Sequence, residues 1–133
     1  MIDVEGLTRY YGEKRAISDV SFHVKEGEIL GMLGPNAAGK TTTMRILTCF
    51  MPPTSGKATI DGYDIFENSM DVRRITGYLP ENPPLYTDMS VTDYLDFVAK
   101  IKGIDKAKRK VEVDSAIEKA ALSDVQTSII GKL

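Results

Sequence analysis

Two glycines, a lysine and a threonine at fixed spacing are the residues of this chain best suited to chemistry. The segment 31–47 reads GMLGPNAAGKTTTMRIL, in which Gly34, Gly39, Lys40 and Thr41 fit the pattern G-x-x-x-x-G-K-[ST]. Successive backbone N–H groups of such a loop, and those at the start of the helix that follows it, point at phosphate oxygens. The sequence therefore predicts a P-loop that binds a nucleotide phosphate chain.

Each residue of this pattern has its own expected role. Gly34 lets the chain leave a strand sharply, and Gly39 allows close approach of the phosphates. Lys40 places a cation on the β- and γ-phosphates, and the Thr41 hydroxyl becomes a ligand of Mg²⁺. The other expected nucleotide-binding positions are Pro35, Asn36, Ala37, Ala38 and Thr42.

Ala37 stands where such loops most often have a third glycine. If this position requires a positive φ, alanine costs about 1–2 kcal/mol that glycine would not. If Ala37 adopts a negative φ, it costs nothing. Gly34 and Gly39, the stricter positions, are intact, so we expect binding to survive in either case.

The P-loop needs a strand before it and a helix after it. Residues 28–34, EILGMLG, form a nearly continuous apolar run, which predicts a strand covered on both faces. Residues 41–51 place Met44, Leu47 and Met51 at spacings of three and four, which predicts a helix with one buried face.

The remaining elements follow from periodicity and turn residues. Alternating apolar and polar residues predict antiparallel strands at 1–11 and 16–24. Ser90 and Asp93 form a capping-box signature for a helix. The other expected elements are strands at 57–65 and 76–80 and helices at 69–75, 91–103 and 105–122. The apolar face of the helix 91–103 is expected to consist of Tyr94, Phe97, Val98 and Ile101.

Composition excludes several classes of protein. The 133 residues are 42% hydrophobic and 27% charged with a net charge of −2, which is ordinary for one soluble domain and gives no bulk charge for binding nucleic acid. We see neither a signal peptide nor an apolar stretch near the roughly 20 residues that span a membrane. The single cysteine, Cys49, is interpreted as a buried small hydrophobe rather than a nucleophile.

Three stretches together resemble the N-terminal part of an ATP-binding cassette (ABC) nucleotide-binding domain, and they read YYGEKRAISDVSFHVKEGEILGMLGPNAAGKTTTMRIL, PPTSGKATIDGYDI and RRITGYLPENPPLYTDMSVTDYL. The resemblance implies an α/β P-loop NTPase fold of the ABC ATPase type, with an antiparallel β-subdomain and the start of a helical subdomain, ending before the signature motif. It assigns 1–89 to the ATP-binding core and 90–133 to the incomplete helical subdomain. The chain is most similar to ATP-binding subunits of exporters with separate membrane partners, including the gliding-motility type.

The resemblance also gives roles to single residues. Tyr11 matches the aromatic residue that stacks on adenine, with Tyr10 as a neighbour that could serve instead and a core strand tyrosine as the alternative. Glu81 stands where the family usually has the Q-loop glutamine, so a Mg²⁺-binding and catalytic role beside Lys40 competes with an exposed loop carboxylate. An ionised glutamate cannot donate the hydrogen bonds of an amide, which weakens the water-positioning role. Tyr86 falls where the family contacts membrane subunits.

Several parts of a complete ATPase are missing from the sequence. No four-residue apolar run ends in Asp-Glu, no signature motif occurs, and the only histidine, His23, lies in a strand before the P-loop and is interpreted as a surface residue. We therefore expect Mg²⁺ and ATP binding, ATP hydrolysis only in a full domain, and no turnover by this chain alone.

The resemblance further implies membrane-spanning transporter subunits and a second nucleotide-binding domain as partners, with no nucleic acid. The expected location is cytoplasmic, at the inner face of the membrane. A module that binds ATP without hydrolysing it is the main alternative. A P-loop kinase or GTPase fits less well, because no Asn-Lys-x-Asp run is present.

Overall fold

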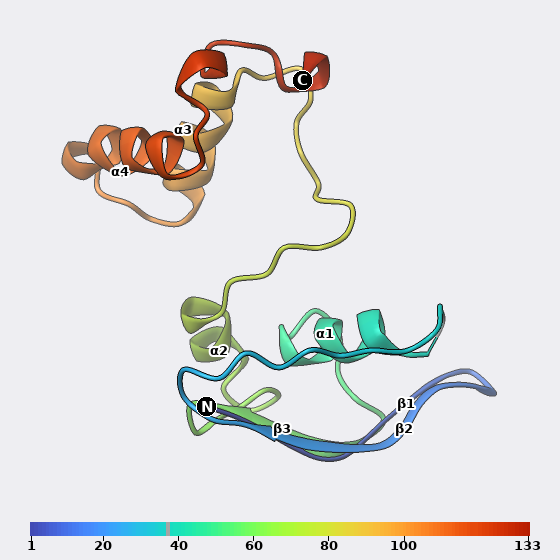
Figure 1. Ribbon diagram of the computed structural model, residues 1–133. Coiled ribbons are helices and arrows are strands. Elements are labelled where there is room, and N and C mark those ends of the chain that lie inside the picture. Colours follow the sequence, from blue (N-terminus) through green and yellow to red (C-terminus); the bar gives the residue numbers. More distant parts are fainter. Residues whose placement is uncertain (37) are drawn as a thin grey trace. The chain divides into compact units, whose positions relative to one another are not determined.

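Figure 1 shows the computed structural model, which describes residues 1–36 and 38–133. The chain divides into two compact units, Met1–Leu79 and Pro80–Leu133, which are described separately. The expected functional division after residue 89 stays a prediction.

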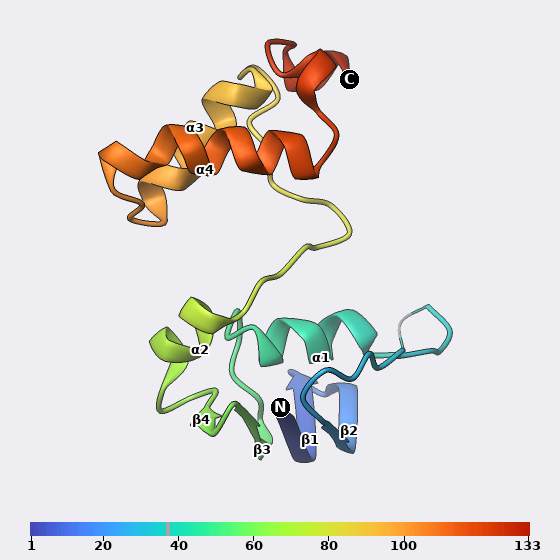
Figure 2. The same cartoon turned by 60° about the vertical axis from the view of Figure 1, so that its left-hand side comes forward.

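The first unit is an antiparallel sheet covered by two helices. Its strands pair in the order β2-β1-β3-β4, and both helices lie on one face of the sheet (Figures 1 and 2). The strands are β1 (Ile2–Tyr11), β2 (Lys14–Val24), β3 (Ser55–Ile60) and β4 (Tyr63–Asp64), and the helices are α1 (Lys40–Leu47) and α2 (Ser69–Ile75). The sheet confirms the expected antiparallel β-subdomain, and α2 has the predicted bounds.

Apolar side chains from the sheet and from both helices form the core of this unit. Leu7 of β1, Ile46 of α1 and Val72 of α2 are fully buried. The cluster also includes Val4, Ile17, Leu47, Cys49, Ala58, Ile60 and Ile65. Because these residues come from strands and helices far apart in sequence, burial of this shared core holds α1 on the sheet.

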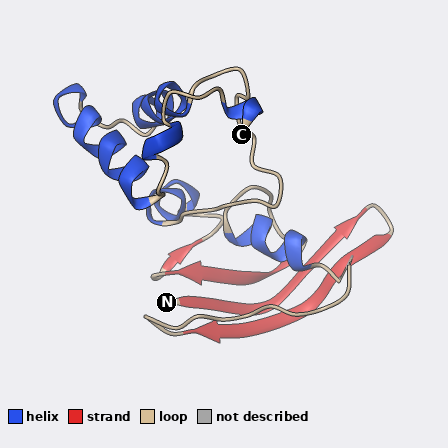
Figure 3. Ribbon diagram, turned by 45° about the horizontal axis from the view of Figure 1, so that its top comes forward, coloured by secondary structure: helices blue, strands red, loops and turns tan. Residues whose placement is uncertain are grey.

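The second unit is built on a helical pair, visible as blue coils in Figure 3. Its elements are α3 (Val91–Ile101), α4 (Lys106–Lys119) and the 3₁₀ turns η1 (Ser123–Val125) and η2 (Ile130–Lys132). The predicted capping box is confirmed, since the Ser90 hydroxyl oxygen lies 3.1 Å from the backbone nitrogen of Asp93 and 2.6 Å from its carboxylate. The capped first turn explains why α3 begins where the sequence predicted.

The buried face of α3 differs from the prediction. Ala99 packs with Val113 and Ile117 of α4, with Leu95 at the edge of the same cluster. Ile101, expected on this face, is 69% exposed. Tyr94, Phe97 and Val98 of the expected face are half-buried, but the stripe that meets α4 is formed by Leu95 and Ala99, which are spaced by four residues.

Two predicted strands are absent from the described residues. Residues 28–34 and 76–80 are not strand. Ile29 is 97% exposed and Leu33 is 95% exposed, so the prediction of a strand buried on both faces is wrong for the chain as it stands. A strand needs hydrogen-bond partners on a neighbouring strand, and no described strand pairs with either segment.

Helix α1 is shorter than predicted, and of the residues expected on its buried face Leu47 is buried and Met44 is exposed. It ends at Leu47, and Cys49 beyond it has a left-handed φ of 57°, which does not continue a helix. The backbone nitrogen of Phe50 donates back to the Arg45 carbonyl at 2.8 Å, which closes the helix end. Met44, expected to be buried, is 40% exposed, and Ile46 takes its place in the core.

Candidate functional site

The start of α1 is fixed against the β1–β2 hairpin by one glycine. Gly39 is the N-cap of α1, with φ 89° and ψ 1°. A Cβ atom at this position would lie 2.1 Å from the Ile17 Cγ2 atom and 2.7 Å from the Ala16 carbonyl oxygen, both in β2. Gly39 is therefore required twice, by its left-handed backbone and by the strand packed beneath it. The sequence predicted neither requirement, because it assigned Gly39 only the close approach of the phosphates.

The third threonine after the lysine locks the same turn. Thr43 is 2% exposed, and its backbone N–H and its hydroxyl both donate to the Gly39 carbonyl, at 2.9 and 3.0 Å. Sequence analysis did not single out Thr43. A hydroxyl four residues after a helix N-cap is the signal that could have identified it.

Lys40 turns back over the P-loop. Its ammonium donates to the carbonyl oxygens of Gly34 and of Pro35, the latter at 2.8 Å. The Pro35 carbonyl also accepts a hydrogen bond from the backbone nitrogen of Ala38 at 3.2 Å. The structure thus brings the two ends of the predicted loop together, with a half-buried cation held between them.

The other loop positions are accessible to a ligand. Asn36, Ala38 and Thr41 are exposed, and Thr42 is half-buried in the first turn of α1. The first N–H groups of a helix have no acceptor within it, and they carry a partial positive charge. Ala37 lies outside the described residues, so both alternatives for its φ stay open.

Tyr11 has contacts at its ring face and at its hydroxyl. The guanidinium carbon of Arg9 lies 5.2 Å from the centroid of the ring, and the hydroxyl oxygen lies 3.1 Å from the Met51 sulfur. Tyr11 is 43% exposed and Tyr10 is 40% exposed, so neither is a core strand tyrosine and exposure does not choose between them.

Glu81 and Tyr86 belong to the second unit. Glu81 is exposed in the chain before α3. Tyr86 makes edge-to-face contacts with Tyr94 and Phe97, with ring centroids 6.3 and 5.4 Å apart. The predicted roles of Glu81 at the metal and of Tyr86 at a membrane subunit stay predictions.

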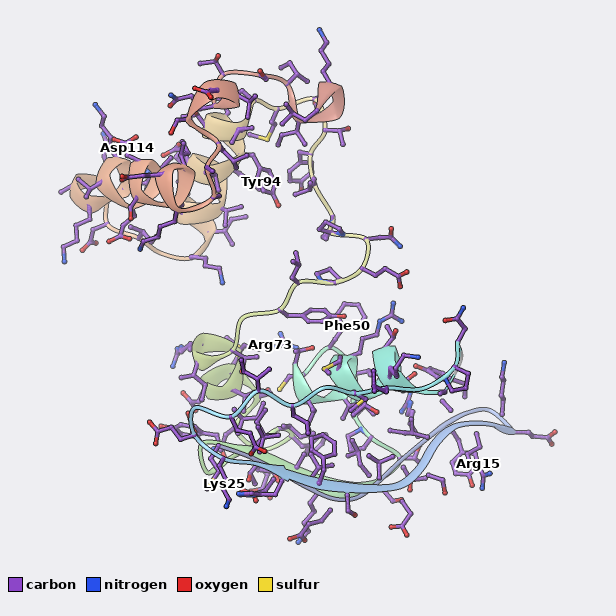
Figure 4. The ribbon with its side chains drawn as sticks, viewed as in Figure 1. Arg15, Lys25, Phe50, Arg73, Tyr94 and Asp114 are labelled. Carbon is purple, nitrogen blue, oxygen red and sulfur yellow. The ribbon has the colours of Figure 1, made fainter. Side chains whose placement is uncertain are left out.

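The cysteine and the histidine lie away from the P-loop chemistry. Cys49 is buried, and its sulfur lies 3.3 Å from the Ile65 carbonyl oxygen, while burial raises the pKa of the thiol. Its own carbonyl accepts a hydrogen bond from Arg73, labelled in Figure 4, at 2.6 Å. His23 is exposed on β2 and pairs with the Asp3 carboxylate on β1. Both side chains match their structural interpretations.

The described residues contain neither a cluster of metal-binding side chains nor a membrane-spanning helix. Among residues 1–36 and 38–133, no group of three or more histidine, cysteine, aspartate or glutamate side chains could hold a metal ion. None of the helices in this part of the chain combines the length and apolar character needed to cross a bilayer.

Known proteins are similar to this chain in sequence and in fold. The ABC transporter family matches residues 17–133. The chain is 37% identical over 131 residues to the uncharacterized ABC transporter ATP-binding protein YxlF of Bacillus subtilis, covering 98% of this chain and 43% of that protein. It is 36% identical over 132 residues to the bacitracin transport ATP-binding protein BcrA of Bacillus licheniformis, covering 99% of this chain and 42% of BcrA.

The fold is similar to that of a solved ATP-binding cassette, MJ0796, whose structure is described as a dimer in a post-hydrolysis state bound to ADP and phosphate. The TM-score is 0.83 at 21% identity, with 100% of this chain and 63% of that one covered. The chain therefore belongs to the ABC transporter family and has the α/β P-loop NTPase fold of its ATPase domains. It spans less than half the length of the two curated relatives named above.

Proposed function

We propose that this protein binds Mg-ATP at residues 34–42 and acts as the ATP-binding subunit of an ABC transporter. The observation that carries the proposal is the position of Lys40 at the start of α1, where its ammonium is held over the loop by the backbone carbonyls of Gly34 and Pro35. An ATP phosphate offers this cation a stronger, charged acceptor than a carbonyl. When ATP binds, the Lys40 ammonium would leave the carbonyl oxygens of Gly34 and Pro35 and bind the β- and γ-phosphates, which would open the loop to the ligand.

The proposal includes further contacts with the phosphates and with the base. The N–H groups of the first turn of α1 would donate to phosphate oxygens, which lie at the positive end of the helix dipole. Tyr11 would stack on the adenine through its exposed ring, since stacking needs no hydrogen-bond pattern. Tyr11 is preferred to Tyr10 on the resemblance to the family.

A magnesium ion would be held by the hydroxyl of Thr41. Thr41 fits this role, because its side chain is exposed directly after Lys40 and offers the hard oxygen donor that Mg²⁺ prefers. When bound, the ion would neutralise charge on the β- and γ-phosphates. Thr41 would orient it, and Lys40 would share the compensation of charge.

The names of the relatives support the wider role. BcrA is named as a bacitracin transport ATP-binding protein, and MJ0796 as a dimeric cassette. We propose that ATP binding here powers transport of a substrate through membrane-spanning partner subunits, with a second nucleotide-binding domain completing the site. The protein would then lie at the cytoplasmic face of the membrane, held there by its partner.

The test is a titration of the purified chain with Mg-ATP by calorimetry. Lys40→Ala should abolish binding, because it removes the cation at the phosphates. The matched control is Lys57→Ala, an exposed lysine on β3 of the same unit, which should bind as the unchanged protein does. Normal binding by Lys40→Ala would refute the P-loop assignment.

A module that binds ATP without hydrolysing it is the second candidate. The 133 residues hold no apolar run ending in Asp-Glu, and their only histidine, His23, lies on β2 before the P-loop. Single-turnover hydrolysis separates the two roles. The chain alone should retain bound ATP, and a longer polypeptide that supplies these groups should convert it to ADP. Hydrolysis by the chain alone would overturn its proposed inactivity.

A further inference from the structure

The contacts around Tyr11 assign a role to Arg9, a residue that the motifs did not include. Arg9 and Tyr11 are two residues apart on β1, and the guanidinium lies over the ring at 5.2 Å from its centroid. This is the geometry of a cation–π contact. One face of the Tyr11 ring is thereby occupied by a side chain of the protein itself.

Other contacts hold the Arg9 guanidinium in place. Its Nη1 atom donates to the Pro52 carbonyl oxygen at 3.0 Å. In the described part of the chain, its Nε atom is buried without a hydrogen-bond partner. Because these contacts leave the positive charge unneutralised, the electron-rich ring of Tyr11 is a favourable neighbour for it.

The segment after α1 that contains Pro52 also contacts the hydroxyl of Tyr11. The Tyr11 hydroxyl oxygen lies 3.1 Å from the sulfur of Met51, one residue before Pro52. The backbone nitrogen of Tyr10 donates to the Thr54 hydroxyl at 3.1 Å. The chain that follows α1 therefore fixes both the ring and its cationic neighbour, which gives the ring one orientation.

We propose that Arg9 is a positioning residue for ATP binding, acting through Tyr11. It packs on one face of the ring, so that the other face is presented to the adenine and the base completes a stack of guanidinium, tyrosine and adenine. This inference rests on the proposed function and on Tyr11 as the stacking residue. It predicts an effect confined to recognition of the base, with none on the phosphates.

The experiment is a double-mutant cycle on the affinity for Mg-ATP. Arg9→Met keeps the length of the side chain and removes the charge, and should weaken ATP about two- to fivefold, the range for a partly exposed cation–π contact. Tyr11→Ala should weaken ATP about 5- to 150-fold. Adding Arg9→Met to Tyr11→Ala should then change nothing further, and Arg9→Lys should restore part of the loss.

Magnesium tripolyphosphate, which lacks the base, is the second probe. Arg9→Met should leave its affinity unchanged, whereas Lys40→Ala should abolish it. If Arg9→Met weakened ATP and tripolyphosphate equally, or acted undiminished in the Tyr11→Ala background, Arg9 would be only a tether for Pro52 and the inference would be overturned. If Lys40→Ala bound ATP normally, the proposed function itself would fail and this inference with it.

Discussion

The two segments that flank the P-loop both carry apolar side chains and have opposite structures. Residues 28–34 enter the loop as an exposed segment without strand pairing, in which Leu33 is 95% exposed. Helix α1 leaves the loop with Ile46 fully buried on the sheet. A helix makes its hydrogen bonds within itself, whereas a strand depends on its neighbours. An apolar run therefore specifies a strand only together with the strands that pair with it.

The largest expected difference in stability is between alanine substitutions of two glycines, one on each side of the P-loop. Gly39→Ala should lower the free energy of unfolding by about 2–5 kcal/mol, since it adds left-handed strain to a clash with Ile17 and Ala16. Gly31 has neither a left-handed φ nor any atom within 4 Å of an added Cβ. Gly31→Ala should therefore stay within about 0.5 kcal/mol. Urea unfolding measures both, and equal losses would contradict the contrast between the flanks.

Two apolar side chains test the same contrast in the core. Ile46→Ala should cost about 2–5 kcal/mol of unfolding free energy, because it opens a cavity among fully buried neighbours. Leu33→Ala should change stability by no more than about 0.5 kcal/mol, because its side chain is already in water. A large loss at Leu33, measured by thermal or urea unfolding, would mean that residues 28–34 are packed in solution.

The second unit offers the same contrast in its helix α3. Helix α3 makes its own hydrogen bonds except in its first turn, where Ser90 accepts one from Asp93. Ser90→Ala should cost about 1 kcal/mol of unfolding free energy. The control is Ser115→Ala in the interior of α4, where alanine is the better helix former and stability should stay equal or rise. Equal losses would contradict the capping role.

The smallest effect concerns Cys49, where the chain turns after α1. Burial raises the pKa of its thiol, and the thiolate is the form that reacts. Modification by a thiol reagent near pH 8 should therefore be slower in the native protein than in urea. Because the pKa of the thiol is raised in the folded state, its contribution to stability is fully present below the unfolded pKa and is lost as the pH rises through the folded pKa. Equal rates in both states would contradict the burial of Cys49.

Local signals predicted much of the molecule. The bounds of α2 and the start of α3 followed from nearby residues, because helix periodicity and capping act within a few positions. The spacing of Gly39, Lys40 and Thr41 placed the candidate site at the start of α1 for the same reason.

The contacts between distant segments could not be predicted from the sequence. The packing of Ile17 under Gly39 and the hydrogen bond from Arg9 to Pro52 join residues far apart along the chain. No periodicity in either segment encodes which element becomes its neighbour. The prediction of a strand at 28–34 was wrong for a related reason. An apolar run forms a buried strand only where other strands pair with it.

The structure of the protein with Mg-ATP bound is the most direct test of the account. We predict the phosphates at the start of α1, with the ammonium of Lys40 moved from the carbonyls of Gly34 and Pro35 onto the β- and γ-phosphates and the adenine against Tyr11. Nucleotide bound elsewhere, with Lys40 still on the two carbonyl oxygens, would contradict it.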